Sequence, residues 1–254
     1  MDGLFQMMDK FNIYISYWKK GNESRVYPET VDTFLIDKFL EYHSKKNPNI
    51  NFKFISIEGY EEYPNGWWPL VKLQNMLSLP QPMFHMDFDI FWNIDLEKLV
   101  YWLIEKDINV LYQSKDFQYT EYKYFRSKFP HVNTEDSYCG GITWWNNIDL
   151  HNIKTSVNNM SNSISKKINQ LWLGMGLEQM YIPYELSKSY KIKTLKDIQD
   201  GITPFLHNME RIPVSILNDK QRSSIIKELN YYHFMTDFKN KPYFKNDIIT
   251  WFKD

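Results

Sequence analysis

Two aspartates, Asp87 and Asp89, stand one residue apart in a run of apolar and aromatic side chains over residues 84–92. Alternate residues of a strand point to the same face, so both carboxylates are expected to aim together, with His85 beside them. Neighbouring carboxylates repel each other unless a cation lies between them. Mg²⁺ and Mn²⁺ take oxygen ligands and keep positions open for phosphate oxygens. The spacing therefore predicts a divalent metal site.

A pair of surface aspartates in a turn before a helix is the alternative interpretation. The apolar surroundings favour the metal site, because they offer little else to neutralise two negative charges. Other motifs for phosphate or metal chemistry are absent from the sequence, including GxxxxGK[ST] and GxGxxG loops, HExxH and cysteine-based zinc spacing. The one cysteine, Cys139, is expected to be a small packed residue rather than a nucleophile.

The elements that must position the aspartates alternate between strand and helix patterns. Strand patterns cover residues 12–18, 47–57, 83–92 and 108–114, and helix patterns cover 28–46, 67–79 and 95–107, the last capped by Asp95. This order predicts an α/β fold with a mostly parallel central sheet and helices on both faces. Asp87 and Asp89 then fall at the carboxyl end of a parallel strand, where open α/β sheets bind ligands.

The second half of the chain has a looser pattern. A strand is expected over 140–146, a turn and then a helix interrupted near Pro183 over 173–190, and a short strand over 231–235. No repeat, low-complexity tract or linker divides the chain. We therefore expect one domain over residues 1–254, in which about 1–115 bind a ligand and about 116–254 complete the site.

The composition is that of an ordinary globular protein, 43% hydrophobic and 24% charged. A formal net charge of -1 argues against a nucleic-acid partner, while the basic segment 188–196 leaves contact with an anionic membrane surface open. One cysteine allows no internal disulfide, and neither a leader-like start nor an apolar run long enough to span a bilayer is present. A cytoplasmic protein is expected, with peripheral contact at the inner face of the membrane as an addition.

These motifs resemble those of the GT-A-fold glycosyltransferases that use nucleotide sugars, whose metal motif is Asp-x-Asp. The segments 138–147 (YCGGITWWNN), 177–181 (LEQMY) and 231–244 (YYHFMTDFKNKPYF) resemble, in order, three motifs of the family-eight retaining bacterial enzymes, such as the lipooligosaccharide galactosyltransferases. The stretch 67–91 is also similar to a bacterial family related to capsule and glycan-modifying transferases. Together the matches span about residues 12–245. Two departures are Thr236, where the family has glycine, and Glu178 with Gln179, where aspartate is commoner.

The resemblance implies a metal ion, Mn²⁺ or Mg²⁺, held by Asp87, Asp89 and His233. It also implies a UDP-sugar as donor substrate. Lys239 lies at the family spacing from His233, whereas Lys241 is followed by Pro-Tyr, and which of the two lysines contacts the phosphates stays open.

Further residues are candidates for binding the donor or the acceptor. Lys72, on the helix before the aspartates, is another candidate for the phosphates. Trp18 is expected either to stack on the nucleobase or to lie in the core. Gly140 and Gly141 either begin a strand or let a sugar of the donor or acceptor approach the backbone closely.

Glu178 and Gln179 are the candidate catalytic residues. Glu178 is expected to stabilise or transiently bond the oxocarbenium-like sugar, as carboxylates do in glycoside chemistry, or to orient donor hydroxyls. Gln179 is its rival for that role, and an ordinary glutamate on a helix surface is the alternative.

The sequence thus predicts a metal-dependent glycosyltransferase of polysaccharide biosynthesis, which moves a sugar from a UDP-sugar to a glycan, a lipid-linked sugar or another hydroxyl acceptor. Retention of configuration is implied by the resemblance alone. A metal-dependent phosphohydrolase or nucleotidyltransferase is one alternative, although Phe91 stands where the phosphatase pattern D-x-D-x-T has threonine. A non-catalytic sugar-binding or interaction domain on a transferase scaffold is the other.

Overall fold

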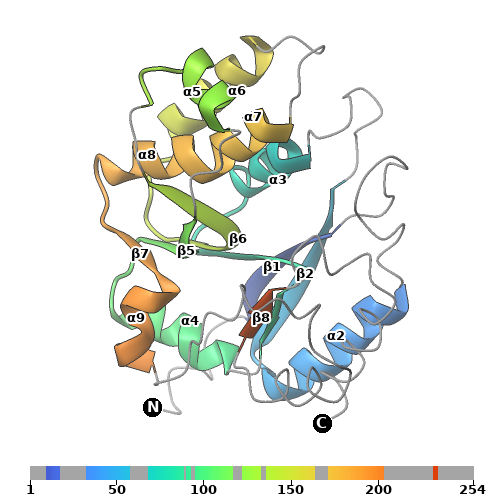
Figure 1. Ribbon diagram of the computed structural model, residues 1–254. Coiled ribbons are helices and arrows are strands. Elements are labelled where there is room, and N and C mark those ends of the chain that lie inside the picture. The colour runs from blue at the N-terminus through green and yellow to red at the C-terminus, as the bar shows by residue number, and fades with distance from the viewer. Residues whose placement is uncertain are drawn as a thin grey trace, which may run out of the picture. The chain divides into compact units, whose positions relative to one another are not determined.

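Strands and helices alternate along the residues that the computed structural model describes, which are 10–17, 33–57, 68–88, 90–92, 95–116, 122–132, 136–163, 171–202 and 231–233 (Figure 1). The strands are β1 (Phe11–Tyr17), β2 (Ile50–Ser56), β3 (Met83–Asp87), β4 (Ile90–Trp92), β5 (Val110–Asp116), β6 (Ser137–Trp145), β7 (Ile192–Thr194) and β8 (Tyr231–His233). The helices are α2 (Thr33–Lys46), α3 (Trp68–Met76), α4 (Leu96–Glu105), α5 (Tyr122–Lys128), α6 (His151–Ser163), α7 (Leu171–Gly176), α8 (Ile182–Ser187) and α9 (Leu195–Ile202). A π-helical turn, η2 (Leu177–Tyr181), joins α7 to α8. None of the helices in these ranges is both long and apolar enough to cross a membrane.

Most of the strands belong to one mixed sheet. They hydrogen-bond in the order β2-β1-β3-β6-β5-β7, and β4 and β8 pair separately. β1 is parallel to β2, and β5 is parallel to β7, whereas β6 runs antiparallel to β5. The α/β class with a mostly parallel sheet, expected from the sequence, is confirmed.

The chain divides into two compact units, each built from separated segments. The first unit contains residues 1–56, 86–106 and 199–254, and the second contains 57–85 and 107–198. The expectation of one domain over 1–254, with halves that meet near residue 115, stays a prediction.

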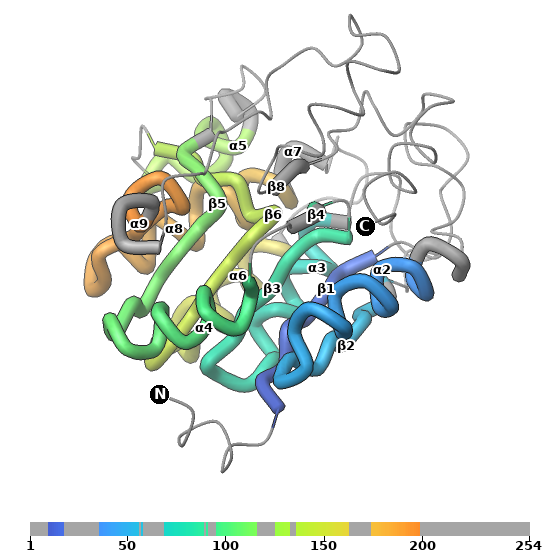
Figure 2. The backbone as a smooth tube through the Cα atoms, turned by 90° about the horizontal axis from the view of Figure 1, so that it is seen from below, coloured from blue at the N-terminus to red at the C-terminus, as the bar shows by residue number. Residues whose placement is uncertain are grey.

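In the first unit, α2 lies beside β2 (Figures 1 and 2), and aromatic side chains fill the contact between them. The ring of Phe39 lies edge-on to the rings of Phe52 and Phe54, with centroids 5.7 Å apart in each case. The cap expected for the helix after the aspartates is confirmed, because Asp95 accepts a hydrogen bond from the N–H of Lys98 at 2.9 Å. Four apolar residues then share the buried face of α4: Leu96, Leu99, Val100 and Leu103.

The segment 83–92 does not form the single strand that its apolar pattern predicts. β3 ends at Asp87, Phe88 is in a turn, and a separate strand, β4, begins at Ile90. The N–H of Phe88 donates to the carbonyl oxygen of Ser16 on β1 at 3.0 Å, and the Phe88 ring is buried near Phe39. Burying an aromatic ring is worth enough to hold the turn in place. The prediction of one continuous strand over residues 83–92 is therefore wrong, whereas Asp89, and with it the face that it shares with Asp87, lies outside the described residues.

In the second unit, β6 lies between strand β5 and the turn η2, with α3, α7 and α8 on the same side of the strands as η2 (Figures 1 and 2). The turn predicted at the start of 173–190 is wrong, because Gly174 and Gly176 lie within α7. Both glycines allow a neighbouring helix to approach α7 closely. A Cβ on Gly176 would lie 2.4 Å from ring carbons of Phe125 on α5, and one on Gly174 would lie 3.2 Å from the backbone nitrogen of Leu70 on α3.

The aromatic cluster of the first unit also encloses a histidine, His43, which is 0% exposed. Its ring centroid lies 4.2 Å from that of Phe39. Burial lowers the pKa of His43 to about 3, and the charge of Lys46 adds to this. The unfolded chain therefore takes up a proton near pH 6.5, before the folded protein does.

We expect the free energy of unfolding to be fully retained above about pH 6.5 and to fall as the pH drops toward 3, by up to about 1.4 kcal/mol per pH unit for this histidine. Urea denaturation between pH 4.5 and 7.5 measures the slope. His43→Phe keeps an aromatic ring in the cluster but cannot bind the proton. We expect this variant to lose the part of the slope that comes from the uptake of one proton on unfolding. An unchanged slope in this variant would contradict the assignment.

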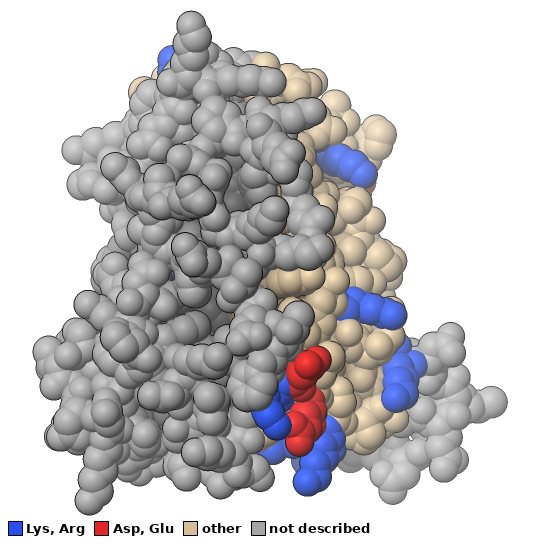
Figure 3. All heavy atoms as spheres, turned by 90° about the vertical axis from the view of Figure 1, so that its right-hand side faces the viewer, with Lys and Arg blue, Asp and Glu red and all other residues tan. Residues whose placement is uncertain are grey.

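Exposed charges in the described parts of the chain are mixed in sign. On the face shown in Figure 3, described acidic side chains lie beside basic ones. Lys188, the first residue of the basic segment 188–196, pairs with Glu185 at 2.7 Å, and Lys115 pairs with Asp136 at 2.9 Å. Exposed pairs of this kind contribute about 0–1 kcal/mol each.

Candidate functional site

Asp87 is the last residue of β3, a strand in which every residue is buried. The aspartate itself is only 8% exposed. Its carboxylate thus stands at the carboxyl end of a buried strand, the place where ligands bind in open α/β sheets. His85, two residues earlier on the same face, is 0% exposed, and burial together with the charge of Lys72 lowers its pKa well below the usual value. His85 is therefore neutral at pH 7.

The C-terminal strand β8 returns to the chain just after the aspartates. β8 pairs antiparallel with β4, so that His233 lies opposite Ile90, and both strands belong to the first unit. Ile90 directly follows Asp89 in the sequence. The short strand expected over 231–235 is confirmed at Tyr231–His233. The role of His233 as a metal ligand stays a prediction.

Several predicted site residues lie outside the described part of the chain. These are Trp18, Asp89, Lys239 and Lys241, and of His233 only the backbone is described. Within the described residues, no three side chains of His, Cys, Asp or Glu form a group that could hold a metal ion. Of the predicted metal ligands, the side chain of Asp87 alone is described.

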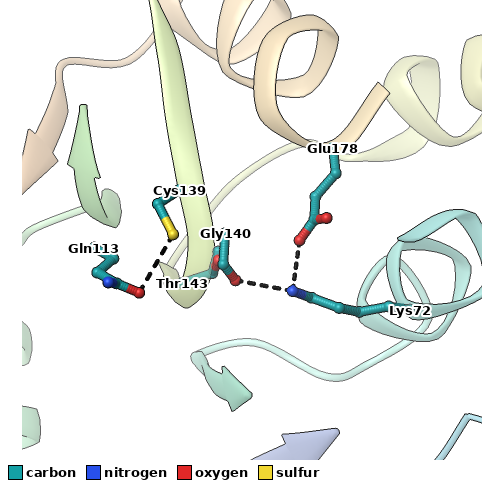
Figure 4. A network of polar contacts seen from close by, with 6 residues as sticks. All are labelled: Lys72, Gln113, Cys139, Gly140, Thr143 and Glu178. Carbon is teal, nitrogen blue, oxygen red and sulfur yellow. Dashed lines mark hydrogen bonds and ion pairs between the residues drawn. The ribbon is translucent and has the colours of Figure 1, made fainter. Parts of the chain in front are cut away.

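The second unit brings together three residues that the sequence placed far apart: Lys72, Gly140 and Glu178. Lys72 lies on α3 between the buried residues Leu70 and Leu73, and is itself 1% exposed. Its Nζ lies 2.6 Å from Oε1 of Glu178 and donates to the carbonyl oxygen of Gly140 at 3.2 Å (Figure 4). Lysine is almost never buried without a partner. The contact with Glu178 therefore explains a lysine in the apolar stretch of α3.

Glu178 and Gln179 lie on the π-helical turn η2, in which all five residues are buried. The N–H of Ile182 donates to the carbonyl oxygen of Leu177, five residues earlier. Pro183 follows, has no N–H, and in a regular α-helix its ring would clash with the carbonyl oxygen of Gln179. The wider turn relieves this clash. The irregularity expected near Pro183 is thus present as a π turn, a feature that is frequent at functional sites.

Gly140 lies in the middle of β6 and leaves room for the carboxylate of Glu178. A Cβ on Gly140 would lie 2.3 Å from Oε1 and 2.9 Å from Cδ of Glu178. Gly141 follows it and is also buried. The two glycines continue β6, which begins at Ser137 rather than at residue 140 as predicted. Gly140 therefore has a definite task, which is to let an acidic side chain reach the backbone of the strand.

Other polar groups complete this cluster. The hydroxyl of Thr143 donates to the carbonyl oxygen of Gly140 at 3.3 Å, and Sγ of Cys139 donates to Oε1 of Gln113 at 3.5 Å (Figure 4). Cys139 is thus a partly exposed hydrogen-bonding residue of β6. Tyr112 on β5 is 1% exposed, and burial, together with the negative charge of Glu178, raises its pKa.

Sequence reasoning named Lys72, Gly140 and Glu178 separately and missed that they meet. It expected Lys72 at the phosphates, whereas in this structure its ammonium lies against Glu178. The available signal was the lysine within the apolar run PLVKL, together with a glycine pair in a strand. A lysine in a buried element indicates that an acidic partner neutralises its charge.

Comparison with known proteins gives likenesses among solved structures alone. No protein-family model matches the chain, and no curated protein matches it. Among solved structures, the chain is similar to a glycosyltransferase involved in the glycosylation of the major capsid of PBCV-1, with a TM-score of 0.47 and 12% sequence identity. The match covers 94% of this chain and 98% of that chain.

Proposed function

We propose that the chain is a metal-dependent glycosyltransferase, which moves a sugar from a UDP-sugar to a glycan or other hydroxyl acceptor with retention of configuration. The pairing of β4 with β8 carries this proposal, because it aligns His233 with the residue that follows Asp89. The two distant segments that carry the proposed ligands, 86–106 and 199–254, belong to the same unit, which supports the proposal. Mn²⁺ accepts a mixed set of oxygen and imidazole ligands better than Mg²⁺ does.

In this proposal Asp87, Asp89 and His233 hold the metal ion. When bound, the ion supplies Lewis-acid stabilisation of the negative charge that grows on the departing diphosphate. Lys239 or Lys241 adds a charge-assisted hydrogen bond to the same phosphates. Trp18 stacks on the nucleobase.

Glu178 acts on the sugar. Its Oε2 is buried and has no hydrogen-bond partner among the described residues. A buried carboxylate oxygen without a donor is costly, and a sugar hydroxyl is a suitable donor. Gly140 and Gly141 keep the strand beside Glu178 free of side chains, and Gln179 is available as a second polar group on the same turn.

Thermal denaturation with UDP and Mn²⁺ tests the proposal. At a UDP concentration about 100 times its Kd, we expect the Tm to rise by about 5 °C or more with Mn²⁺ and UDP together, and to rise little with UDP alone. Asp89→Ala is expected to abolish the rise. Asp95→Asn, which removes a nearby exposed charge but keeps the helix cap, is the matched control and should retain the rise.

The two alternatives predict different results, one in thermal denaturation with glycans and one in a phosphatase assay. Stabilisation by free glycans without metal would indicate a non-catalytic sugar-binding domain. Release of phosphate from simple phosphate esters, without UDP-sugar turnover, would indicate a phosphohydrolase. Either result would overturn the glycosyltransferase proposal.

A further inference from the structure

The ion pair between Lys72 and Glu178 is shielded from water on both sides. The side chain of Lys72 is 2% exposed and that of Glu178 is 3% exposed, at a distance of 2.6 Å between Nζ and Oε1. Taking two charges out of water costs several kcal/mol per ion, and only a close pair with further hydrogen bonds offsets this cost. A pair so deeply buried is weak evidence for stability, so a reason for keeping it must be sought in what it does.

The geometry fixes the carboxylate at one oxygen. Lys72 holds Oε1 and is itself held by the carbonyl oxygen of Gly140 at 3.2 Å, while the missing side chain of Gly140 leaves the space that Oε1 occupies (Figure 4). Oε2 is left without a hydrogen-bond partner among the described residues. One oxygen of Glu178 is thus anchored by a cation, and the other is able to accept a hydrogen bond.

The ionisable groups in this region lie on the elements packed against η2, of which α7 carries none, and on the strand β5 next to β6. They are Lys72 on α3, Tyr138 and Cys139 on β6, Tyr184 and Glu185 on α8, Tyr181 within η2 itself, and Tyr112 on the neighbouring strand β5. Burial raises the pKa values of Tyr112, Tyr138 and Tyr181, so these phenols stay neutral at pH 7. Among these groups, Lys72 is the cation at ion-pair distance from Glu178.

We infer that Lys72 is a positioning residue that acts through Glu178, keeping it a carboxylate with one oxygen anchored and the other available as a fixed hydrogen-bond acceptor. An ammonium group 2.6 Å from Oε1 offsets much of the negative charge of the carboxylate. Glu178 in this state is a poor nucleophile and a poor proton donor. The catalytic part of this inference rests on the proposed function, whereas the state of the ion pair does not.

A pH series of thermal denaturation tests the ion pair without any substrate. In Lys72→Met the buried carboxylate loses its cation and binds a proton more readily in the folded state than in the unfolded chain. Stability of this variant is then retained at low pH and lost as the pH rises. We expect its Tm to lie about 10 °C below that of the wild type at pH 8, and the deficit to shrink by at least half at pH 5.

A second variant keeps the test decisive where Lys72→Met folds poorly. Lys72→Met/Glu178→Gln removes both charges and is expected to recover most of the Tm lost at pH 8 and to show a deficit that is equal at pH 5 and pH 8. Lys188→Met is the matched control, because Lys188 pairs with Glu185 at 2.7 Å while 51% exposed, and its deficit should be small at both pH values. A Lys72→Met deficit that does not depend on pH, or a double variant no more stable than Lys72→Met, would overturn the inference.

The activity arm separates a positioning role from a purely structural one. With UDP-sugar turnover as the assay, we expect Lys72→Met to lose kcat on the acid side of neutral pH, where Glu178 becomes protonated, and Lys72→Arg to keep the wild-type pH profile. In the Lys72→Met background at pH 5, adding Glu178→Gln should lower kcat by less than about a further threefold. A wild-type pH profile in Lys72→Met overturns the positioning role. If no UDP-sugar is turned over at all, the proposed function fails, and the Tm series still decides the state of the pair.

Discussion

Asp87→Asn is expected to lower kcat/KM for sugar transfer by about 10³-fold or more. The amide keeps the shape of the side chain at the end of β3, so the packing of this buried strand is preserved. It removes the negative charge that a divalent cation requires, and metal stabilisation of a leaving group is worth several kcal/mol, each 1.36 kcal/mol being tenfold in rate. Initial rates of UDP-sugar consumption over a Mn²⁺ titration measure the effect.

Two controls accompany this variant. Asp95→Asn should keep the wild-type rate, since Asp95 caps α4 and asparagine caps helices equally well. The Tm of Asp87→Asn without metal should stay close to that of the wild type, because like-sized substitution leaves no cavity. Mn²⁺-dependent turnover at the wild-type level in Asp87→Asn would rule out Asp87 as a metal ligand.

Gly140→Ala is expected to cost about 2–4 kcal/mol in the free energy of unfolding and at least about 100-fold in kcat. The added Cβ would lie 2.3 Å from Oε1 of Glu178, closer than any real Cβ contact, so the carboxylate must leave its place beside Lys72. Moving it separates a buried ion pair and displaces the group proposed to hold the sugar. Chemical denaturation and turnover assays measure the two losses.

A double-mutant cycle shows whether Glu178 is the cause of the stability loss. In a Glu178→Ala background the space beside Gly140 is empty, so Gly140→Ala should then cost less than about 1 kcal/mol. An equal cost in both backgrounds would mean that the alanine clashes with something other than Glu178, and the account given for Gly140 would fail.

The described elements match the prediction where the period of the apolar residues and the capping residues indicate the same helix or strand. Helix α4 is an example, since Asp95 caps it and its apolar residues repeat on one face. The late strand at Tyr231–His233 was also visible in the pattern YYHFM. The fold class came from the alternation of such elements along the first half of the chain.

Other features depend on contacts between residues far apart in the chain, which no local pattern contains. The break after Asp87 follows from the bond of Phe88 to Ser16 and from burial of its ring. Gly174 and Gly176 resemble turn residues, yet they lie in a helix because two neighbouring helices come close. The meeting of Lys72 with Glu178 likewise requires α3 and η2 to be packed together.

The π turn has a consequence for how chain length affects the site. Such a turn is equivalent to one extra residue inserted into an α-helix, and each residue of a helix turns the following ones by about 100°. A chain one residue shorter between Leu177 and Tyr181 would lose the wider turn that accommodates Pro183, and it would rotate Glu178 or Gln179 away from β6. We therefore expect this helix to be more sensitive to insertions and deletions than to substitutions. In a variant library, single-codon deletions across η2 would separate loss of the site from loss of the helix.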